Sequence, residues 1–390
     1  MILSYCTNIH PAENWKETLR ALDTHVLAVR DRLTESGYQS ASEAFPIGLR
    51  LSAVAARELC AADNLARFKD WLSENRSYVF TINGFPYGSF HSTRVKERVF
   101  LPDWTSPHRL SYTQDLFHIL AEIAPKSTGG SVSTLPGSHK TFHADETLIL
   151  ENLTKLACFA EDLSQKHQID LHLGLEPEPL GHFENTPETI AFFNRLHSHA
   201  KSPAIIEKRI GLNFDSCHFA LEYEDADVAL DAITAAGIRL SKIHLSNAIA
   251  FDPRDEAALA EIRHYDEPTY FHQVIALRFD RSLQRFLDLP DFFSAIDCGE
   301  ISQADFTEAR VHFHIPLDTA PQAPLKSTRS HVEETLRWCQ KHPAKCQHFE
   351  IETYTWAVLP QNLQRPVEQQ IAAEFHWVIE QLKKPCFPAL

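Results

Sequence analysis

The sequence predicts an α/β protein built as a (β/α)8 barrel, and three observations support this prediction. Short runs in which apolar and polar residues alternate, as they do in strands with one buried face, recur eight times along the chain. Stretches with apolar residues at helical spacing lie between these runs. Several runs end in an ionisable group, and a barrel has its active site at the carboxyl ends of its strands. An open sheet with one solvated face also gives such alternation and stands as the alternative.

Each expected strand has an apolar face that would pack on an outer ring of helices and a polar face that would line the barrel. In chain order, the residues of the polar faces are Cys6, Asn8 and His10; Gly48, Arg50 and Ser52; Thr81 and Asn83; Ser131 and Ser133; Asp170, His172, Gly174, Glu176 and Glu178; Gly211, Asn213 and Asp215; Lys242, His244 and Ser246; and His348, Glu350 and Glu352. Because every second residue points to the same face of a strand, these polar faces converge inside a closed barrel.

Helices are expected between the strands. Apolar residues recur at helical spacing in residues 15–33 and again in residues 153–163. The segment Asn185-Thr-Pro-Glu188 ahead of Ile190 predicts a capped helix start with Pro at the first position. Alternating strands and helices of this kind predict a parallel sheet covered by helices.

We expect a single barrel domain over residues 1–390 with one long insertion. A typical barrel of this class has about 250 residues, whereas this chain has 390. The insertion is expected at residues 251–318, between the seventh and eighth strands, at the barrel mouth. No Gly/Ser-rich or Pro-rich linker divides the sequence, although two domains stay open as an alternative.

The charge of the chain bears on its partners. The sequence has 37 basic and 52 acidic residues and a formal net charge of −15. Such a surface repels polyanions, so no nucleic-acid partner is expected. No apolar run of about 18 residues and no signal-peptide pattern is found, so we expect a cytoplasmic protein without direct membrane insertion. Its eight cysteines lack close paired spacing and are expected to be reduced thiols.

Four ionisable residues would reach the mouth of the barrel from four different strands. They are Glu176, Asp215, His244 and Glu352. Three carboxylates and an imidazole suit a divalent ion, but this set does not distinguish manganese, zinc, magnesium and iron. If such an ion polarises a hydroxy-carbonyl substrate, Glu176 and Glu352 are the candidate catalytic residues that remove and return a proton. Taken singly, each residue is as readily a hydrogen-bonded polar group that lines the barrel.

Further residues are candidates for additional metal ligands or for substrate contacts. The additional metal or substrate candidates are His10, His91, His218, His272, His312 and His314, and simple packing is the alternative role for any one of them. The substrate-binding candidates are Asn83, Phe85, Tyr87, Glu178 and Trp356. The segment Asn83-Gly-Phe-Pro-Tyr-Gly88 is either a rigid loop at the mouth or an ordinary strand-to-helix turn. Glu178 and Glu350 are also candidates for orienting a ligand by hydrogen bonding.

Several strand ends resemble the metal-binding strand ends of the xylose-isomerase-like TIM barrels. The segments are Leu175-Glu176, Ile210-Gly-Leu-Asn-Phe-Asp-Ser-Cys-His218, Lys242-Ile-His244-Leu245 and Glu352-Thr353. That superfamily includes sugar isomerases, epimerases and apurinic endonucleases of the endonuclease IV type. In its epimerases two glutamates, an aspartate and a histidine hold a divalent ion, and the two glutamates carry the proton. The resemblance implies these roles for Glu176, Glu352, Asp215 and His244.

Longer segments resemble the EboE family, barrel proteins of the ebo gene cluster that are described as metabolite-traffic proteins. These segments are Leu3-Ser-Tyr-Cys-Thr-Asn-Ile-His10, Tyr78-Val-Phe-Thr-Ile-Asn-Gly-Phe-Pro-Tyr-Gly88, Leu175-Glu-Pro-Glu-Pro179, His312-Phe-His314-Ile-Pro316 and Glu350-Ile-Glu-Thr-Tyr-Thr-Trp356. The resemblance implies the handling or export of a small secondary metabolite or prenylated precursor, with other ebo-cluster proteins as partners. It implies no particular reaction.

Three functions are compatible with the sequence. The first is a metal-dependent isomerase, epimerase or related lyase that acts on a small polyol-like or cyclic metabolite of such a pathway. The second is a non-catalytic metabolite-binding or scaffold protein of the same pathway. The third is an apurinic-endonuclease-like phosphodiesterase, which the acidic charge disfavours. The Asp-x-His pair of those endonucleases is replaced here by His312-Phe-His314.

Overall fold

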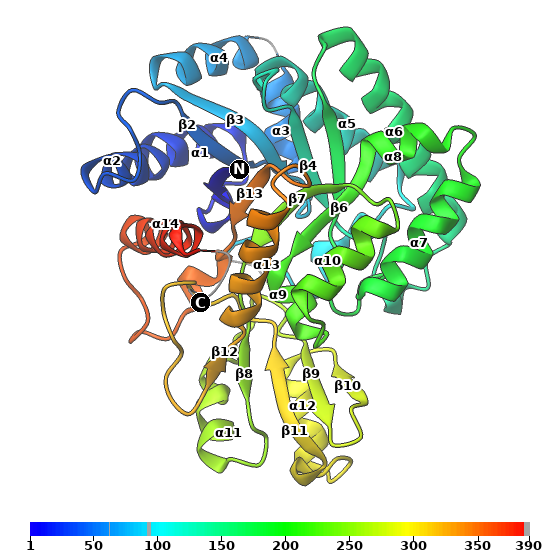
Figure 1. The fold of residues 1–390 in the computed structure, drawn as a ribbon, viewed down its shortest axis with the longest axis vertical. Helices are drawn as coiled ribbons and strands as arrows, with labels where there is room; N and C mark the ends of the chain where they lie inside the picture. The colour runs from blue at the N-terminus through cyan, green and yellow to red at the C-terminus, as the bar shows by residue number, and fades with distance from the viewer. Residues whose placement is uncertain (62, 92–94, 386–390) are drawn as a thin grey trace.

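The computed structural model describes residues 1–61, 63–91 and 95–385, and its main body is a barrel of eight parallel strands (Figure 1). Their bounds are β1 (Ile2–Tyr5), β2 (Phe45–Arg50), β3 (Ser77–Asn83), β4 (Gly130–Thr134), β5 (Leu171–Leu175), β6 (Ile210–Asp215), β7 (Leu240–Leu245) and β13 (His348–Ile351). They pair in the order β1-β13-β7-β6-β5-β4-β3-β2, and a parallel bridge between Cys6 and Gly48 joins the two ends. The predicted (β/α)8 barrel is confirmed, and the open-sheet alternative is wrong.

The alternation in the sequence determines which side chains fill the barrel. In β6, Leu212 and Phe214 belong to the apolar core between the strands and the helices. Asn213 and Asp215 are also fully buried, but Asn213 donates to His244 of the neighbouring strand. The interior is crowded, because a Cβ atom at Gly48 would overlap the Glu350 carboxylate. Polar groups are therefore packed inside the barrel against one another.

A ring of helices covers the outer face of the barrel (Figure 1). Their bounds are α1 (Trp15–Ala21), α2 (Leu27–Glu35), α3 (Ala53–Cys60), α4 (Asn64–Glu74), α5 (Pro107–Ile123), α6 (Glu146–His167), α7 (Thr186–His199), α8 (Pro203–Arg209), α9 (Ser216–Leu221), α10 (Ala226–Ala235), α13 (Arg329–Lys341) and α14 (Val367–Lys383). The expected helical run at residues 15–33 is interrupted by a π-helical turn, Leu22–Val26. The Asn185 side chain caps α7 as expected, but Pro187 is the second helical residue and not the first.

The first expected strand is displaced in the structure. The strand is Ile2–Tyr5, and the residues after Cys6 form a 3-10 turn, Thr7–Ile9, so Asn8 and His10 are not part of the strand. The turn forms because the His10 amide bonds back to the Thr7 carbonyl, which ends the extended conformation. The fifth strand likewise ends at Leu175, which places Glu176 and Glu178 in the loop that follows.

A second sheet is built from the chain between β7 and β13. Its antiparallel strands are β10 (Leu283–Phe286), β9 (Val274–Arg278), β11 (Phe306–Val311), β8 (Ile249–Phe251) and β12 (Lys326–Ser327), in that order. Two helices, α11 (Glu256–Ile262) and α12 (Leu289–Asp297), accompany it. We call this sheet and its two helices the extra unit. It starts before residue 251 and ends after residue 318, because β8 and β12, at its two chain ends, pair with each other. Figure 1 shows it beyond the mouth of the barrel.

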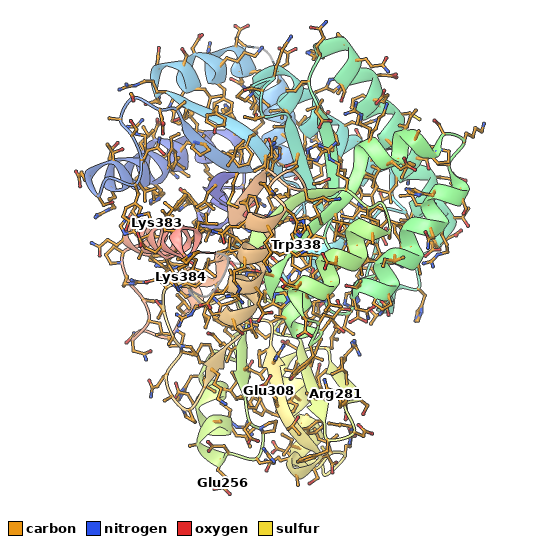
Figure 2. The ribbon with its side chains drawn as sticks, viewed as in Figure 1. Glu256, Arg281, Glu308, Trp338, Lys383 and Lys384 are labelled. Atoms are coloured by element: carbon orange, nitrogen blue, oxygen red, sulfur yellow. The ribbon has the colours of Figure 1, made fainter. Side chains whose placement is uncertain are left out.

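Each sheet has its own apolar core. The larger core fills the space between the barrel strands and their helices, and a second cluster, which includes Phe251, Phe292 and Phe306, fills the extra unit. Figure 2 shows the charged side chain of Glu256 at the outer end of that unit. In the part of the chain that the structure describes, no helix has the length and apolarity needed to cross a membrane.

Candidate metal centre

Four buried side chains converge at the barrel mouth. Glu176 follows β5, Asp215 ends β6, His244 lies in β7 and Glu352 follows β13, and one ligand atom of each lies within 4.8 Å of the others. The His244 Nδ1 atom is 3.1 Å from a Glu176 oxygen, 3.6 Å from Asp215 Oδ2 and 3.3 Å from a Glu352 oxygen. We call these residues the mouth group. The structure brings together the four residues that the sequence proposed as metal ligands.

Asp215 shows how the local fold aims a carboxylate into the mouth. It ends β6 and caps α9, so Oδ1 accepts the amide hydrogens of Cys217 and His218. The Ser246 hydroxyl donates to the same oxygen. Because Oδ1 is saturated by these donors, Oδ2 is left to face His244.

The mouth group fits a divalent cation by the chemistry of its donors. Glu176 Oε2 and Asp215 Oδ2 are buried without a hydrogen-bond partner in the described chain. A buried carboxylate oxygen without a donor is costly, and a cation would compensate both atoms at once. Carboxylate oxygens and one imidazole nitrogen from separate strands match the ligand sets of hard and borderline metals.

A buried ion pair supports His244 from the far side of its ring. Glu350 Oε2 accepts a hydrogen bond from His244 Nε2 at 2.9 Å and pairs with the Lys242 ammonium group. Lys242 also donates to Ser133 Oγ at 3.2 Å. Because the Glu350 carboxylate can only accept, it keeps a proton on Nε2 and leaves Nδ1 for the mouth. The expected role of Glu350 in orienting a ligand agrees with this geometry.

Two asparagine amides hold Glu352. Asn8 and Asn83 each donate to Glu352 Oε1 at 2.9 Å. Its other oxygen is the one that approaches His244. The carboxylate is therefore fixed through one oxygen and free to act through the other.

Three histidines form a second group beside the mouth group. His218 lies in α9, and His312 and His314 follow β11. The Nε2 atom of His312 is 3.2 Å from that of His218 and 3.1 Å from that of His314. Ligand atoms of Asp215, His218 and His314 also lie within 4.8 Å of one another, so the two groups adjoin. We call these residues the histidine group.

In each ring of the histidine group, the Nδ1 atom contacts an oxygen that can only accept a hydrogen bond. His218 Nδ1 is 2.8 Å from the Pro177 carbonyl, and His314 Nδ1 is 2.8 Å from the Glu352 carbonyl. His312 Nδ1 is 2.8 Å from Gln273 Oε1. Each Nδ1 therefore carries a proton, so a metal would bind at Nε2. Although burial disfavours the charged form of His218, Asp215 and Glu178 raise its pKa above the usual value. Two of these rings at a time, with a third residue, lie close enough to suit one transition metal: Glu178 with His218 and His312, Asp215 with His218 and His314, or Cys217 with His312 and His314.

Burial and charge shift the pKa values of these groups in opposite directions. Desolvation disfavours the charged form of His244, but Glu352 and Glu176 more than offset it and raise its pKa well above the usual value. Desolvation also opposes ionisation of Asp215, yet His218 and His244 hold its pKa well below the usual range. Burial lowers the pKa of both His312 and His314. The carboxylates of the mouth group thus stabilise a positive charge. His312 and His314 are stabilised in the neutral form, which is the form that binds metals.

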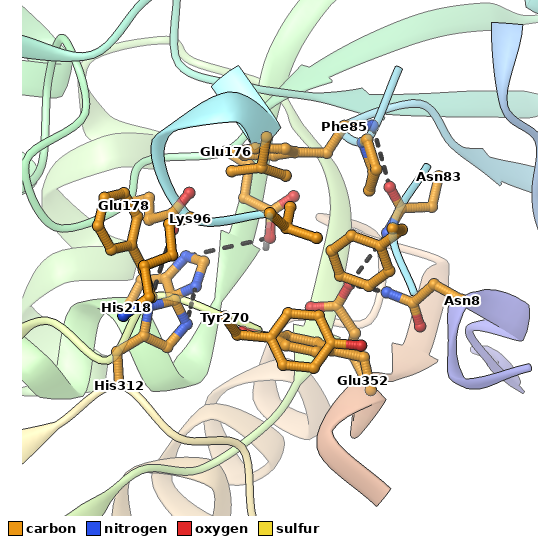
Figure 3. A pocket seen from close by; sticks show the side chains of 16 residues that line it. Asn8, Asn83, Phe85, Lys96, Glu176, Glu178, His218, Tyr270, His312 and Glu352 are labelled. Atoms are coloured by element: carbon orange, nitrogen blue, oxygen red, sulfur yellow. Dashed lines mark hydrogen bonds and ion pairs between the residues drawn. The ribbon is translucent and has the colours of Figure 1, made fainter. Parts of the chain in front are cut away.

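A cavity that is partly open to solvent leads to both groups (Figure 3). Its polar end includes Glu176, Glu178, His218, His312 and Glu352. Asn83 and Phe85, two of the expected substrate contacts, line it as well. Burial raises the pKa of Glu178 to about 8, so this carboxyl is largely protonated near neutral pH.

Five of the expected residues lie away from the cavity lining. His10 bonds the Tyr5 hydroxyl and stacks on His25, His91 lies 3.7 Å from Glu13, and His272 bonds Glu267 and the His312 carbonyl. Tyr87 packs edge-on against Tyr112. Trp356 donates its indole hydrogen to the Arg365 carbonyl. The structure thus places these five residues in other contacts and not on the cavity lining, and their expected roles stay predictions.

Most of the apolar lining of the cavity could not be predicted from the sequence. Phe90, Val95 and Val99 lie between β3 and α5, and Tyr270 and Phe271 lie in the extra unit before β9. None of these residues belongs to an alternating run. Tyr354 follows Glu352 by two residues, so its position after a barrel strand was a usable signal.

Comparison with known proteins agrees with this architecture. No protein-family model and no curated protein sequence matches the chain. Among solved structures, the IOLI protein with a bound zinc atom superposes with a TM-score of 0.50 at 11% identity, covering 98% of each chain. A D-tagatose 3-epimerase-like protein gives a TM-score of 0.50 at 10% identity, covering 98% of this chain and 97% of that one. A xylose isomerase domain protein from Alicyclobacillus acidocaldarius gives 0.48 at 13% identity, covering 97% and 98%. The IOLI protein and the D-tagatose 3-epimerase-like protein thus share the barrel fold of this chain.

Proposed function

We propose that the protein is a metal-dependent isomerase or epimerase that acts on a small hydroxy-carbonyl metabolite at the barrel mouth. The observation that carries this proposal is the convergence of Glu176, Asp215, His244 and Glu352 in one buried group that opens to a cavity. The zinc ion of the IOLI protein and the epimerase-like character of a second structural neighbour support a metal-dependent reaction of this class.

The mouth group would hold the divalent ion. When bound, such an ion supplies Lewis acidity, which polarises the carbonyl and hydroxyl oxygens of a substrate. The identity of the metal, whether manganese, zinc, magnesium or iron, is left open by these ligands.

Glu176 and Glu352 would move the proton. They approach the mouth from separate strands, and each has one oxygen next to His244. One carboxylate takes the proton from the carbon beside the carbonyl group, and the electron pair of that C–H bond forms a C=C bond while the carbonyl oxygen gains charge. Return of a proton to the opposite face of the same carbon inverts it. Return to the neighbouring carbon moves the carbonyl group, provided that the hydroxyl proton on the first carbon passes to the former carbonyl oxygen. Asn8 and Asn83 position Glu352 for this exchange.

The histidine group would hold a second cation. His312 Nε2 lies close to the Nε2 atoms of both His218 and His314, and the three Nδ1 atoms are fixed by oxygen acceptors. Its proximity to Asp215 would let that carboxylate face both ions. Two adjacent ions stabilise charge on two substrate oxygens at once.

The resemblance to the EboE family supports a more specific role, the handling of a metabolite in an ebo-type pathway of the cytoplasm together with other proteins of that cluster. The same cavity without turnover would serve a metabolite carrier or scaffold, which is the second candidate. A role as a phosphodiesterase acting on DNA is disfavoured by the net charge of −15.

Exchange of carbon-bound hydrogen with solvent tests the proposal without knowledge of the natural substrate. The metal-loaded protein is incubated in D2O with a set of 2-hydroxy aldehydes and 2-hydroxy ketones, and NMR follows loss of the proton beside the carbonyl group. We expect exchange with at least one compound, and a fall of at least a hundredfold for Glu176→Gln and Glu352→Gln. Circular dichroism checks that both variants fold.

Two results would count against catalysis. If the wild-type protein binds compounds of the set but exchanges no proton, the carrier function is favoured. If both glutamine variants exchange as fast as the wild-type protein, the proton transfer belongs to other residues.

A further inference from the structure

The cavity above the mouth group has a wall whose chemistry differs from its floor. The floor is built from carboxylates, imidazoles and amides. The wall is built from Phe85, Phe90, Val99, Tyr270, Phe271 and Tyr354. Figure 3 shows the ring of Tyr270 across the cavity from Glu176. The two ends of a ligand in this cavity would therefore meet different surroundings.

Three aromatic rings of this wall come from segments far apart in the chain. Phe90 follows β3, Tyr270 precedes β9 in the extra unit, and Tyr354 follows β13. Their ring centroids are 5.2 Å apart for Phe90 and Tyr270, 5.3 Å for Phe90 and Tyr354, and 5.0 Å for Tyr270 and Tyr354. Rings at these distances pack on one another, so they present a continuous aromatic surface.

Most donor groups of the polar side chains near this wall are already engaged, although Asn8 Oδ1 has no hydrogen-bond partner in the described chain. The Lys96 ammonium group pairs with Asp288. The Asn8 and Asn83 amides donate to Glu352. Among the described residues of the wall, the tyrosine hydroxyls are then the side-chain groups left for hydrogen bonds to a ligand. The body of a sugar carries several hydroxyl groups, each of which needs a partner when it is buried.

We infer that the substrate is an amphipathic metabolite in which an aromatic or hydrocarbon body carries the hydroxy-carbonyl group, and that it is not a free sugar. This inference rests on the proposed function, because the mouth group must hold the hydroxy-carbonyl end. A sugar hydroxyl buried against Phe90 or Val99 without a partner would lose affinity by roughly five- to a hundredfold. An apolar body would gain affinity in proportion to the surface it buries on the same residues.

The extra unit takes part in this selection. Tyr270 and Phe271 belong to it, whereas Phe85, Phe90 and Tyr354 follow barrel strands. The barrel thus supplies most of the polar floor, while the extra unit adds His312 to the floor and completes the apolar wall. Loop segments carried on a rigid barrel are the usual place for determinants of specificity.

Three chelating probes that differ only in their body test the inference. They are benzohydroxamic acid, acetohydroxamic acid and D-gluconohydroxamic acid, and isothermal titration measures their dissociation constants on the zinc-loaded protein. We expect benzohydroxamic acid to bind at least tenfold more tightly than acetohydroxamic acid, which corresponds to about 1.4 kcal/mol. We expect the polyol probe to bind no more tightly than acetohydroxamic acid. A smaller aryl preference, or tighter binding of the polyol probe, would overturn the inference.

A matched pair of substitutions locates the effect on the wall. Val99→Asn places an amide on the wall, and Val228→Asn makes the same change at a site in α10 that is 66% exposed and does not line the cavity. Val99→Asn should weaken benzohydroxamic acid at least fivefold while acetohydroxamic acid keeps its affinity. Val228→Asn should leave all three probes unchanged. Equal aryl affinity in the two variants would contradict a role of the wall.

Removal of the metal separates this inference from the proposed function. In protein stripped with a chelator, all three probes should bind more weakly while the aryl preference stays. If removal of the metal leaves every affinity unchanged, the metal site of the proposed function is contradicted. The inference about the wall is then still tested by whether benzohydroxamic acid binds more tightly than acetohydroxamic acid. If stripping weakens all probes but no preference is found in either form, the wall inference is wrong and the metal site stands.

Discussion

At the scale of single residues, side chains at the mouth each have one atom held by hydrogen bonds within the protein and another atom that faces the proposed metal site. Asp215 caps α9 through Oδ1 and turns Oδ2 to the mouth. Glu352 is held at Oε1 by Asn8 and Asn83. His244 is held at Nε2 by Glu350. This division fixes the geometry of the proposed ligands before any ion binds, which lowers the cost of binding.

The Lys242–Glu350 pair should affect metal affinity and stability separately. We expect Glu350→Gln to weaken zinc binding about 10–100-fold, because the amide no longer fixes a proton on His244 Nε2. Lys242→Met should leave zinc binding within a few-fold but lower stability by about 3–5 kcal/mol, since it leaves the Glu350 charge buried and unpaired. Competitive zinc titration and urea unfolding measure the two effects. Equal zinc affinity in Glu350→Gln and the wild-type protein would argue against this positioning role.

The histidine group should account for one of two bound ions. We expect the wild-type protein to take up two equivalents of zinc, and His312→Asn to take up one, because His312 is the ring that contacts both of its neighbours. His264→Asn, at a ring that is 67% exposed in the extra unit, is the control and should still bind two. Metal analysis after dialysis gives the stoichiometry. Two tightly held equivalents in His312→Asn would show that the second ion lies elsewhere.

At the scale of elements, short connections place the candidate ligands. Helix α9 starts directly after β6, so His218 lies one turn beyond Asp215. The chain leaves β11 through His312 and His314, whose Nε2 atoms lie 3.1 Å apart. The mouth thus receives ligands from barrel strands and from the edge of the second sheet.

The capping of α7 gives a test of element stability that is independent of the metal centre. Asn185 accepts the Glu188 amide hydrogen at 3.0 Å, so Asn185→Ala should lower the free energy of unfolding by about 1 kcal/mol. Ser202 precedes α8 and makes no side-chain capping bond, so Ser202→Ala should cost less than about 0.5 kcal/mol. Urea unfolding measures both changes, and equal costs would show that the bond of Asn185 does not stabilise the helix.

The alternation of residues predicted most of the barrel and the mouth group. Glu176, Asp215, His244 and Glu352 could be placed because a strand end is readable from alternation, and all barrel strands end at one mouth. The second sheet was not predicted, since strands as short as Lys326–Ser327 leave no periodic pattern. The aromatic wall was missed for a related reason: Phe90 and Tyr270 lie in irregular segments whose meeting depends on tertiary structure.

At the scale of the whole molecule, Glu374 links the C-terminal helix to both sheets. It lies in α14, is 1% exposed, and accepts hydrogen bonds from the Leu317 amide and the Thr353 hydroxyl. Leu317 lies in the chain that returns from β11, and Thr353 follows β13. Burial raises the pKa of Glu374 to about 8, so the folded protein holds this carboxyl protonated at neutral pH.

This buried acid should make stability fall as the pH rises. The pKa of Glu374 is about 8 in the folded protein and near the ordinary 4.5 when unfolded, so the folded state binds the extra proton. The stabilisation that this proton provides is complete below about pH 4.5 and is lost as the pH rises to about 8. The amide of Glu374→Gln does not titrate, so the stability of this variant does not fall in this way. We expect its free energy of unfolding, relative to that of the wild-type protein, to increase over this pH range by up to about 5 kcal/mol. Urea unfolding from pH 5 to pH 8 measures the difference, and a constant difference would contradict the raised pKa.

The central claim is that side chains from four strand ends form one metal site, and anomalous diffraction tests it most directly. Crystals of the zinc-loaded protein, measured above and below the zinc absorption edge, should show a strong anomalous peak about 2.0–2.2 Å from ligand atoms of Glu176, Asp215, His244 and Glu352. Crystals of Asp215→Asn should show this peak greatly weakened. A zinc peak only at other side chains, or no peak at the mouth at saturating zinc, would contradict the claim.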